Sequence, residues 1–321
     1  MDIRELRYFT HVARAGSFSR AAANLNVAQP ALSRQVKQLE QELGVQLFER
    51  TQRGVELTKA GSLLFSQAED IIEHLARTLD LVRSSSDAFA GHVALGLAPT
   101  SGLLIAPEIF GIFKSRWPHA TLVIREGVSS SLEEWLQSRR VDIAVLHNPT
   151  PLDGIDMLPI LHERMVLISA YADGAEAAKG VRFKDLSDVP LILPSLPHSN
   201  RRLLERAAIQ HNSRLNLALE VDSVPLTKAM VKAGFASTIM TFAGAALEVE
   251  RKELIARPIE RPPLISNICI GMPREARLSW LTMELGRLLR SCITKLVTQG
   301  SWPAATIFEG AANEFHPPEP H

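Results

Sequence analysis

The fold of the first sixty residues is decided by two short segments, Gly16-Ser17-Phe18-Ser19-Arg20-Ala21-Ala22 and Gln29-Pro30-Ala31-Leu32-Ser33-Arg34-Gln35-Val36. Gly16 is suited to end the amphipathic helix that precedes it, and Ser17 or Ser19 can cap the next helix. Pro30 suits the first turn of a third helix, because its missing N–H would be unpaired at that position. The two segments therefore predict three helices, with a turn over residues 24–29 between the second and the third.

The third predicted helix has one apolar side and one polar side. Its apolar stripe consists of Leu32, Val36, Leu39 and Leu43,. Alanines at positions 21–23 let the second and third helices approach closely, as a helix-turn-helix requires. Residues 47–58 then predict two short strands around a glycine turn. Arg50 and Arg53 lie at the tip, where a wing would place them against the backbone or minor groove of DNA.

This order of residues resembles the winged helix-turn-helix of LysR-type transcriptional regulators. Other parts of the matching string are Leu6-Arg7-Tyr8-Phe9, Leu39-Glu40, Leu43-Gly44, Leu47-Phe48-Glu49-Arg50, Leu57-Thr58 and Gly61. The resemblance implies groove-facing roles for Gln29, Pro30, Ser33 and Arg34, and phosphate or minor-groove contacts for Lys37, Arg50 and Arg53. The alternative is that these are ordinary solvated side chains. One departure is Ala28, where the family often has a capping Ser, so either Gln29 caps the helix or the cap is weaker.

Composition describes an ordinary globular protein. The chain has 321 residues, of which 46% are hydrophobic and 22% are charged, which predicts one or two domains,. No apolar run reaches the roughly 18–20 residues that span a bilayer, and the charged N-terminus lacks the apolar stretch of a signal peptide. Cys269 and Cys292 are too few for a disulfide scaffold or a cysteine-rich metal site,. We therefore expect a cytoplasmic protein without a membrane partner.

The net charge of zero conceals an uneven distribution. Residues 1–60 carry nine basic and six acidic side chains, for a net charge of +3, and the rest of the chain carries −3. The zero total therefore does not exclude DNA as a partner. A charge of +3 is modest, so we expect affinity for DNA to depend on dimerisation and on placed contacts more than on bulk attraction.

Residues 59–87 predict a long linker helix, since no Pro interrupts the segment before the break at Ser84-Ser85-Ser86,. Its apolar stripe, with Ile72 beside it, comprises Leu64, Ala68, Ile71, Leu75, Leu79 and Val82. Such spacing suits a coiled-coil seam between two copies, and the alternative is a helix packed on its own domain. The resemblance favours a homodimer and, beyond it, a homotetramer. Two-fold pairing would place the recognition helices one or more helical turns of DNA apart.

Residues 91–300 alternate short apolar runs with helical patterns, which indicates α/β units around a largely parallel sheet. The expected strands are Val93–Leu97, Thr121–Ile124, Val141–Leu146, Met165–Ser169, Leu191–Leu193, Leu217–Val221, Thr238–Met240 and Ile268–Gly271. A strand, a Pro with Thr or Ser, and a helix recur at residues 97–102 and 193–199. This repeat predicts two similar lobes, and helix N-termini at the cleft between them can hold an anion.

The layout resembles the effector-binding domain of the same family, itself similar to a periplasmic binding protein. The resemblance implies lobe I over about 91–161 and 266–300, lobe II over about 162–265, and effector contacts from Thr100, Ser101, Ser129, His147, His198, Asn200 and Ser223. Thr100 and Ser101 could equally cap a helix, and the others could be ordinary strand-end or loop residues. Ala236 and Thr241 stand where the family commonly has Gly and Pro. The resemblance therefore does not determine the shape of this edge of the cleft.

The expected ligand is a small-molecule effector that acts as a co-inducer. Few basic residues other than Arg201 and Arg202 map to the cleft, so a small or singly charged organic acid fits better than a highly charged molecule. We expect no cofactor, metal or catalytic residue. Double-stranded promoter DNA is the main partner, and the resemblance also implies RNA polymerase.

An enzyme on the α/β scaffold is the alternative function. His147 and Asp142 suggest a triad, but they lie five residues apart on one predicted strand, and an odd spacing sends them to opposite faces. A small-molecule-binding protein without DNA activity has no need of the helix-turn-helix. The chain is thus expected to be an α+β multidomain protein, with residues 1–58 as the winged helix-turn-helix. Residues 301–321, which contain four Pro, are expected to form a disordered tail,.

Overall fold

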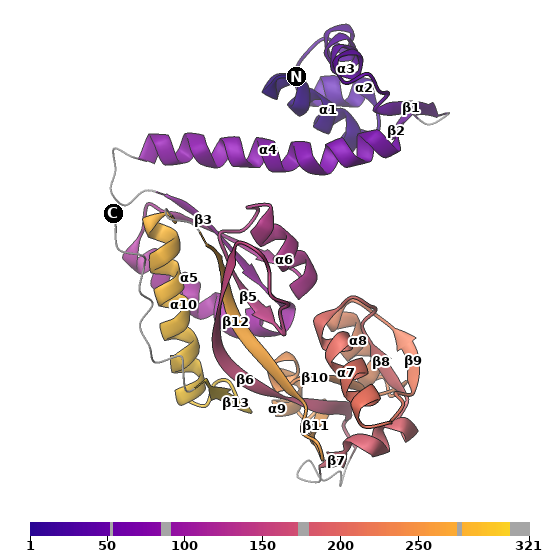
Figure 1. Ribbon diagram of the computed structural model, residues 1–321, viewed down its shortest axis with the longest axis vertical. Coiled ribbons are helices and arrows are strands. Elements are labelled where there is room, and N and C mark those ends of the chain that lie inside the picture. The colour runs from indigo at the N-terminus through magenta and orange to yellow at the C-terminus, as the bar shows by residue number, and fades with distance from the viewer. Residues whose placement is uncertain (52–53, 85–90, 173–179, 275–277, 309–321) are drawn as a thin grey trace. The chain divides into compact units, whose positions relative to one another are not determined.

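The computed structural model describes residues 1–51, 54–84, 91–172, 180–274 and 278–308 (Figure 1). The chain divides into two compact units, Met1–Ser86 and Asp87–His321. We call them the N-terminal unit and the C-terminal unit. Each has hydrophobic clusters of its own. Within the described ranges, no helix combines the length and apolarity that a membrane span requires.

The N-terminal unit contains three short helices, a two-stranded hairpin and one long helix: α1 Ile3–Ala15, α2 Phe18–Asn24, α3 Gln29–Leu43, β1 Phe48–Thr51, β2 Gly54–Leu57 and α4 Lys59–Ser84. Gly16 ends α1 with a φ of 59°, and the Ser17 side chain caps α2 by accepting from Arg20 N–H,. Pro30 lies in the first turn of α3. The three predicted helices and the hairpin are therefore confirmed.

The cap of α3 is weak. Ala28 occupies the N-cap position and offers no side-chain hydrogen bond. Gln29 does not replace it, because its Nε2 donates to Ser33 Oγ at 3.4 Å. Of the two alternatives at this position, the weaker cap is the one observed.

The core of the N-terminal unit forms where α1, α2 and α3 pack together. Leu32, Val36 and Leu39 of the predicted stripe are buried, but Leu43 is 38% exposed. The prediction for Leu43 is wrong because it is the last residue of α3, where the neighbouring helices no longer cover the stripe. Glu40 of α3 accepts from Leu47 N–H at 2.8 Å, which ties the start of the hairpin to the third helix.

The hairpin is held against α1 at a glycine. Val55 N–H donates to the Gly16 carbonyl at 3.1 Å. Gly54 has a φ of 142°, and a Cβ there would lie 2.3 Å from the Gly16 carbonyl oxygen. Only glycine permits both this backbone conformation and this approach.

The first half of α4 packs on its own unit. Ala68 is fully buried, Leu64, Phe65 and Ile72 pack against the same cluster, and Glu69 pairs with Arg14 at 2.8 Å. Ile71 nevertheless remains 43% exposed. The side chains of Leu79 and Val82 lie outside the described residues. Packing on its own domain, the alternative to a coiled-coil seam, therefore describes the first half of the helix.

The C-terminal unit comprises two lobes (Figure 1). Lobe I holds β3 His92–Leu97, α5 Pro99–Arg116, β4 Thr121–Glu126, α6 Ser129–Gln137, β5 Ile143–His147 and α10 Trp280–Thr298. Lobe II holds β7 Val181–Arg182, η1 Phe183–Asp188, β8 Leu191–Leu193, α7 Ser199–Gln210, β9 Leu217–Glu220, α8 Val224–Lys232, β10 Thr238–Thr241, η2 Phe242–Gly244, α9 Ala246–Glu250 and β11 Leu254–Glu260.

Two long strands, β6 Ile155–Ala170 and β12 Ile265–Pro273, connect the lobes. The first part of β6 pairs with β12, and its last residues pair with β10 and β11 of lobe II. The described sheet is mixed, so the expectation of a largely parallel sheet is wrong. Strands β3, β4 and β5 are parallel, whereas β12 runs antiparallel to both β5 and β6. The reason is that β6 carries the chain from lobe I to lobe II and β12 carries it back.

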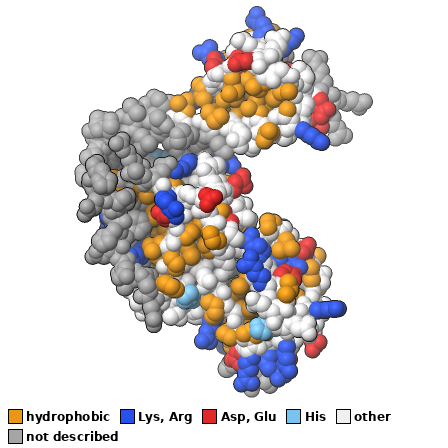
Figure 2. Space-filling view, viewed as in Figure 1, with side chains coloured by type: hydrophobic (Ala, Val, Ile, Leu, Met, Phe, Trp, Pro, Cys, Tyr) orange, Lys and Arg blue, Asp and Glu red, His pale blue; other side chains and the backbone are white. Residues whose placement is uncertain are grey.

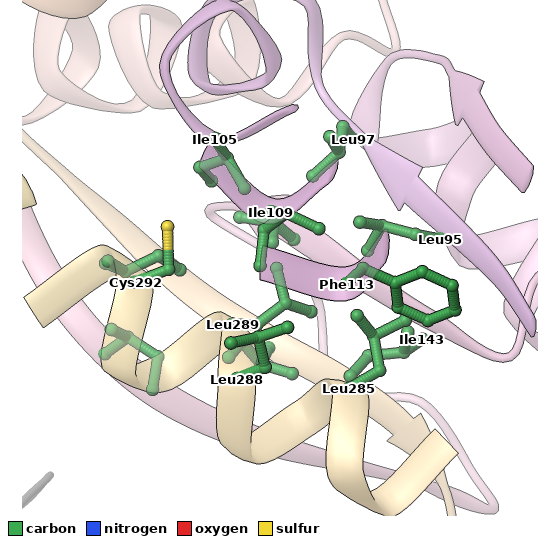
Figure 3. Packing of buried hydrophobic residues seen from close by; sticks show 14 of the residues in the cluster. Leu95, Leu97, Ile105, Ile109, Phe113, Ile143, Leu285, Leu288, Leu289 and Cys292 are labelled. Atoms are coloured by element: carbon green, nitrogen blue, oxygen red, sulfur yellow. The ribbon is translucent and has the colours of Figure 1, made fainter. Parts of the chain in front are cut away.

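Each lobe has its own hydrophobic core. In lobe I, α5 packs Ile105, Ile109 and Phe113 against Leu285 and Leu289 of α10 (Figure 3). Strands β3 and β5 complete this core, and their side chains are almost all buried. In lobe II, Met165 and Leu167 of β6 belong to a separate cluster. The lobes are therefore two packed bodies joined by β6 and β12.

The beginning of the expected tail is folded. Strand β13, Ala305–Ile307, pairs with β6 in antiparallel fashion, and Trp302 is 1% exposed. The prediction of disorder over residues 301–321 is therefore wrong for its first eight residues. Three residues are too few to show a periodicity in the sequence, and their strand forms because β6 offers an edge. Residues 309–321 lie outside the described ranges.

Candidate DNA-binding surface and effector cavity

The exposed side of α3 gathers most of the predicted DNA contacts. Gln29, Pro30, Arg34 and Lys37 are exposed and Ser33 is half-buried. Spacings of three and four residues place such positions on one side of a helix, away from Leu32, Val36 and Leu39. Arg34 Nε donates to the Pro30 carbonyl at 3.3 Å, which leaves its terminal nitrogens at the surface. The surface presents a guanidinium, an ammonium, an amide and a hydroxyl, all of which bind bases or phosphates.

The two predicted wing residues are only partly described. Arg50 lies in β1 opposite Val55, and its side chain is outside the described residues. Arg53 itself lies outside the described residues. The hairpin that carries them is fixed beside α1 by the Gly16–Val55 hydrogen bond.

A cavity of about 50 Å³ lies between the two lobes of the C-terminal unit, and we call it the interlobe cavity. Its lining includes the predicted residues Thr100, Ser129, His147, His198 and Asn200. Ser101 lies behind the lining, where its Oγ contacts His147 Nε2 at 3.0 Å. Ser223 is not among the lining residues, because its side chain caps α8 by accepting from Leu226 N–H.

The first turns of four helices converge on the interlobe cavity. Thr100 belongs to α5, Ser129 to α6, Asn200 to α7 and Thr227 to α8. Thr100 and Ser101 do not cap α5, whose N-cap residue is Ala98. The free N–H groups and the positive ends of the helix dipoles make this region favourable for an anion.

His147 is the central polar side chain of the cavity. It is 3% exposed, its backbone N–H donates to Ser129 Oγ at 3.1 Å, and its Nδ1 has no hydrogen-bond partner among the described residues. Burial, together with a smaller effect of the nearby His198, lowers the pKa of His147 to about 4. The ring is therefore neutral near pH 7 and offers one free nitrogen to a ligand.

Sequence reasoning missed several lining residues: Ser199, Asp222, Thr227 and Thr238. Ser199 is 2% exposed, and its Oγ has no partner among the described residues. Asp222 accepts from both the backbone N–H and the hydroxyl of Ser195 at 2.8 Å, which holds the pKa of its carboxyl below the usual range. Ser199 lies between the predicted residues His198 and Asn200, and Asp222 directly precedes the predicted Ser223. Their position next to predicted residues is the sequence signal that could have identified them.

The position of Thr100 depends on close packing between the lobes. A Cβ at Gly244, in η2, would lie 2.7 Å from Thr100 Cγ2. Because glycine has no Cβ, η2 can approach the first turn of α5 this closely.

Ala236 and Thr241, the departures from the family pattern, are absent from the lining residues of the described cavity.

No Lys or Arg lines the interlobe cavity within the described residues. Arg201, expected near the cleft, is 7% exposed and pairs with Glu205 and Glu220. Arg202 instead lines a separate cavity. The helix ends are therefore the source of positive partial charge at this cavity, against the carboxylate of Asp222 in its lining, and this balance suits a small, weakly charged ligand,.

The residues considered for a catalytic triad have other partners. His147 contacts Ser101 and Ser129, whereas Asp142 accepts from Ala94 N–H at 2.7 Å. Among the described residues, no three His, Cys, Asp or Glu side chains lie together in a way that could hold a metal ion.

Comparisons with known proteins agree with this architecture. The family model described as "Bacterial regulatory helix-turn-helix protein, lysR family" matches residues 3–62, and the one described as "LysR substrate binding domain" matches residues 86–291. The HTH-type transcriptional regulator BbuR of Bordetella bronchiseptica is 31% identical over 303 residues, which cover 94% of this chain and 93% of that protein. The nitrogen assimilation regulatory protein nac of Escherichia coli is 27% identical and covers 93% of this chain and 97% of its own length.

A similar fold is found in the crystal structure of full-length CbnR complexed with its target DNA. It has a TM-score of 0.75 and 24% identity, and the match covers 91% of this chain and 100% of that one. The two family models together span most of the chain, in the same order as the two units. The chain therefore belongs to the LysR family of bacterial DNA-binding transcriptional regulators.

Proposed function

We propose that this protein binds promoter DNA through the exposed side of α3 and that a small organic acid in the interlobe cavity controls the binding. Gln29, Pro30, Ser33 and Arg34 read the major groove, and Lys37, Arg50 and Arg53 contact phosphates or the minor groove. The observation that carries the effector site is the convergence of four helix first turns on a cavity with an unpartnered His147 nitrogen,.

The acid is the expected class of effector for two physical reasons. A carboxylate can accept from free N–H groups at the helix ends and from the hydroxyls of Thr100 and Ser129. The cavity volume of about 50 Å³ favours a compact molecule, and a larger one would require the lobes to separate. A ligand that binds one arrangement of the lobes better than another shifts the population toward it, which is how it changes promoter binding and bending.

The DNA-binding surface is tested by mobility shift with genomic fragments. Arg34→Ala should reduce specific affinity by about 1–3 kcal/mol, the loss expected for one base-reading contact. Arg257→Ala, an arginine of β11 in the C-terminal unit, is the matched control and should bind DNA normally. Equal affinity of the wild type and Arg34→Ala for the specific fragment would contradict the proposed surface.

The effector cavity is tested by thermal shift of the full-length protein with a panel of small monocarboxylic acids. The acid that binds should raise Tm by mass action, and Thr100→Val and Ser129→Ala should reduce that rise. Thr121→Val, at an exposed position of β4, is the control and should leave it unchanged. If no acid raises Tm, or if the cavity variants respond like the control, the effector proposal fails.

The active form is proposed to be a homodimer, which assembles further into a homotetramer that acts with RNA polymerase in the cytoplasm. Hydrophobic side chains gather over α4 and the helices beside it on the face shown in Figure 2. Leu63 of α4 is 70% exposed and Ile71 is 43% exposed. A second copy packed along the helix would cover such side chains, and pairing would present two recognition helices to one operator. Regulation, not catalysis, is thus the proposed role.

A further inference from the structure

A second and larger cavity lies beside α7, and we call it the arginine cavity. Its volume is about 670 Å³, within the roughly 300–1,000 Å³ typical of small-molecule sites,. The connection from β5 to β6 and the first half of β6, within residues 148–162, form one wall, and Ser199, Arg202, Leu203 and Arg206 of α7 form another. Ser199 also lines the interlobe cavity, so α7 separates the two spaces.

In the part of the chain that the structure describes, the basic side chains that line the arginine cavity have no acidic side chain among them. Arg202, Arg206, Arg274 and His162 line it, and no Asp or Glu is among its lining residues within the described chain. The charge of Arg274 is compensated by Asp156, which is not a lining residue, because Arg274 Nε donates to Asp156 Oδ1 at 2.6 Å. Arg202 and Arg206 therefore carry the uncompensated positive charge.

Both of these arginines have guanidinium N–H donors without an acceptor among the described residues. Arg202 uses Nη1 to donate to the Pro197 carbonyl at 2.9 Å, while its Nη2 is buried without a hydrogen-bond partner among the described residues. Arg206 follows one helical turn later on the same side of α7, and no hydrogen bond or ion pair is found for it within the described residues,. A buried guanidinium nitrogen without a partner is costly, and an anion would satisfy it.

A buried hydroxyl adds to this donor set. Ser199, one turn before Arg202 and Leu203, is 2% exposed, and its Oγ is likewise unpartnered. The remaining walls are mostly apolar, formed by Leu152, Ile155, Met157, Leu161, Leu203 and Phe308. His162 packs edge-on against the Phe308 ring and contacts Asn267 Oδ1 at 2.7 Å. The cavity thus combines a basic end with an apolar body.

We propose that the arginine cavity is a second ligand site, distinct from the interlobe cavity, for a carboxylate attached to a hydrocarbon or aromatic body. The carboxylate binds the guanidinium groups of Arg202 and Arg206 and the Ser199 hydroxyl, in the bidentate geometry that guanidinium favours. The body of the ligand packs against Leu161, Leu203 and Phe308. Inorganic phosphate lacks this apolar part and binds more weakly.

The test is isothermal titration of the full-length protein with phenylacetate, with its neutral amide and with inorganic phosphate. Phenylacetate should bind, and the amide and phosphate should each bind at least about tenfold more weakly. Arg202→Gln and Arg206→Gln should each weaken phenylacetate binding about tenfold. Arg251→Gln, an exposed arginine of lobe II outside the cavity, is the matched control and should bind phenylacetate like the wild type.

Variants of the interlobe cavity separate the two sites. Thr100→Val and Ser129→Ala should leave the phenylacetate binding that depends on Arg206 intact, whatever they do to the effector response. An unchanged Tm of the C-terminal unit without ligand shows that Arg206→Gln is folded, and Arg206→Lys should recover part of the lost affinity for phenylacetate. The proposal is overturned if phenylacetate fails to bind at millimolar concentration. It is also overturned if the arginine variants bind phenylacetate like Arg251→Gln, or if only the interlobe variants lose binding.

Discussion

Glu163 is a buried carboxyl at the point where β6 passes from one lobe to the other. Its side chain has no exposed surface, and its Oε1 accepts from Ala243 N–H at 2.8 Å. Burial raises the pKa of Glu163 to about 7, against the opposing effect of that hydrogen bond,. Because the pKa is raised in the folded state, the contribution of Glu163 to the free energy of unfolding is fully present below about pH 4.5. It is lost as the pH rises toward 7,.

Glu163→Gln should therefore stabilise the C-terminal unit at pH 8 and have little effect near pH 4.5. The amide oxygen still accepts from Ala243 N–H, and no charge has to be buried. A pKa shift from 4.5 to about 7 corresponds to at most about 3 kcal/mol,. Urea unfolding at the two pH values measures the difference, with Glu126→Gln, an exposed residue of β4, as the control. A gain of the same size at both pH values would contradict the assignment.

At the scale of elements, α1 and α2 each begin with a side-chain cap, from Asp2 and Ser17, whereas α3 begins without one. The reason is that Ala28 offers no side-chain acceptor. Ala28→Ser should supply a hydroxyl to the free N–H groups of the first turn and stabilise α3 by about 1 kcal/mol. Hydrogen exchange of the α3 amides is the measurement, and their protection should rise. Ala23→Ser, at an exposed position within α2, should give no such gain. Slower exchange in both variants would mean that capping is not the cause.

The wing is an element whose attachment depends on Gly54. Gly54→Ala should be destabilising by about 1–3 kcal/mol, since alanine is strained at a φ of 142° and its Cβ would meet the Gly16 carbonyl,. We expect a lower Tm of the N-terminal unit together with weaker DNA binding, because the hairpin loses its contact with α1. Gly111→Ala, in α5 with nothing near the added methyl, is the control and should be neutral or slightly stabilising,. A Gly54→Ala protein with normal Tm would show that the approach to Gly16 is not required.

At the scale of the whole molecule, the apolar stripe of α4 continues past the part that packs on its own unit. Leu79→Glu should therefore prevent dimerisation, which sedimentation velocity measures directly. The monomer should bind a two-half-site operator far more weakly, and the salt dependence of binding should be about half as steep, because one set of phosphate contacts is lost. Ser66→Glu adds the same charge at an exposed position on another side of α4 and should remain dimeric. A dimeric Leu79→Glu protein would place the contact elsewhere.

The sequence by itself determined the N-terminal unit, because its signals are local. Gly16, Ser17 and Pro30 mark helix ends within a few residues of the groups they satisfy, and the apolar stripe of α3 identifies its buried side. The resemblance to the family, rather than local reasoning, pointed to Thr100, Ser129 and Asn200, which stand in the first turns of their helices after short strands. In the structure these three residues line the interlobe cavity, beyond the ends of the strands that precede their helices,.

Only the tertiary structure decided the rest, because it depends on residues far apart in the chain. Strand β6 pairs with β12 and with β13, partners more than one hundred residues away, so neither its length nor the mixed sheet follows from local periodicity. The same long-range packing buries Glu163, separates Ser101 from the cavity lining and leaves Arg202 Nη2 without a partner. Burial and missing partners are properties of a packed interior, which a residue acquires from its neighbours in space and not from those in sequence.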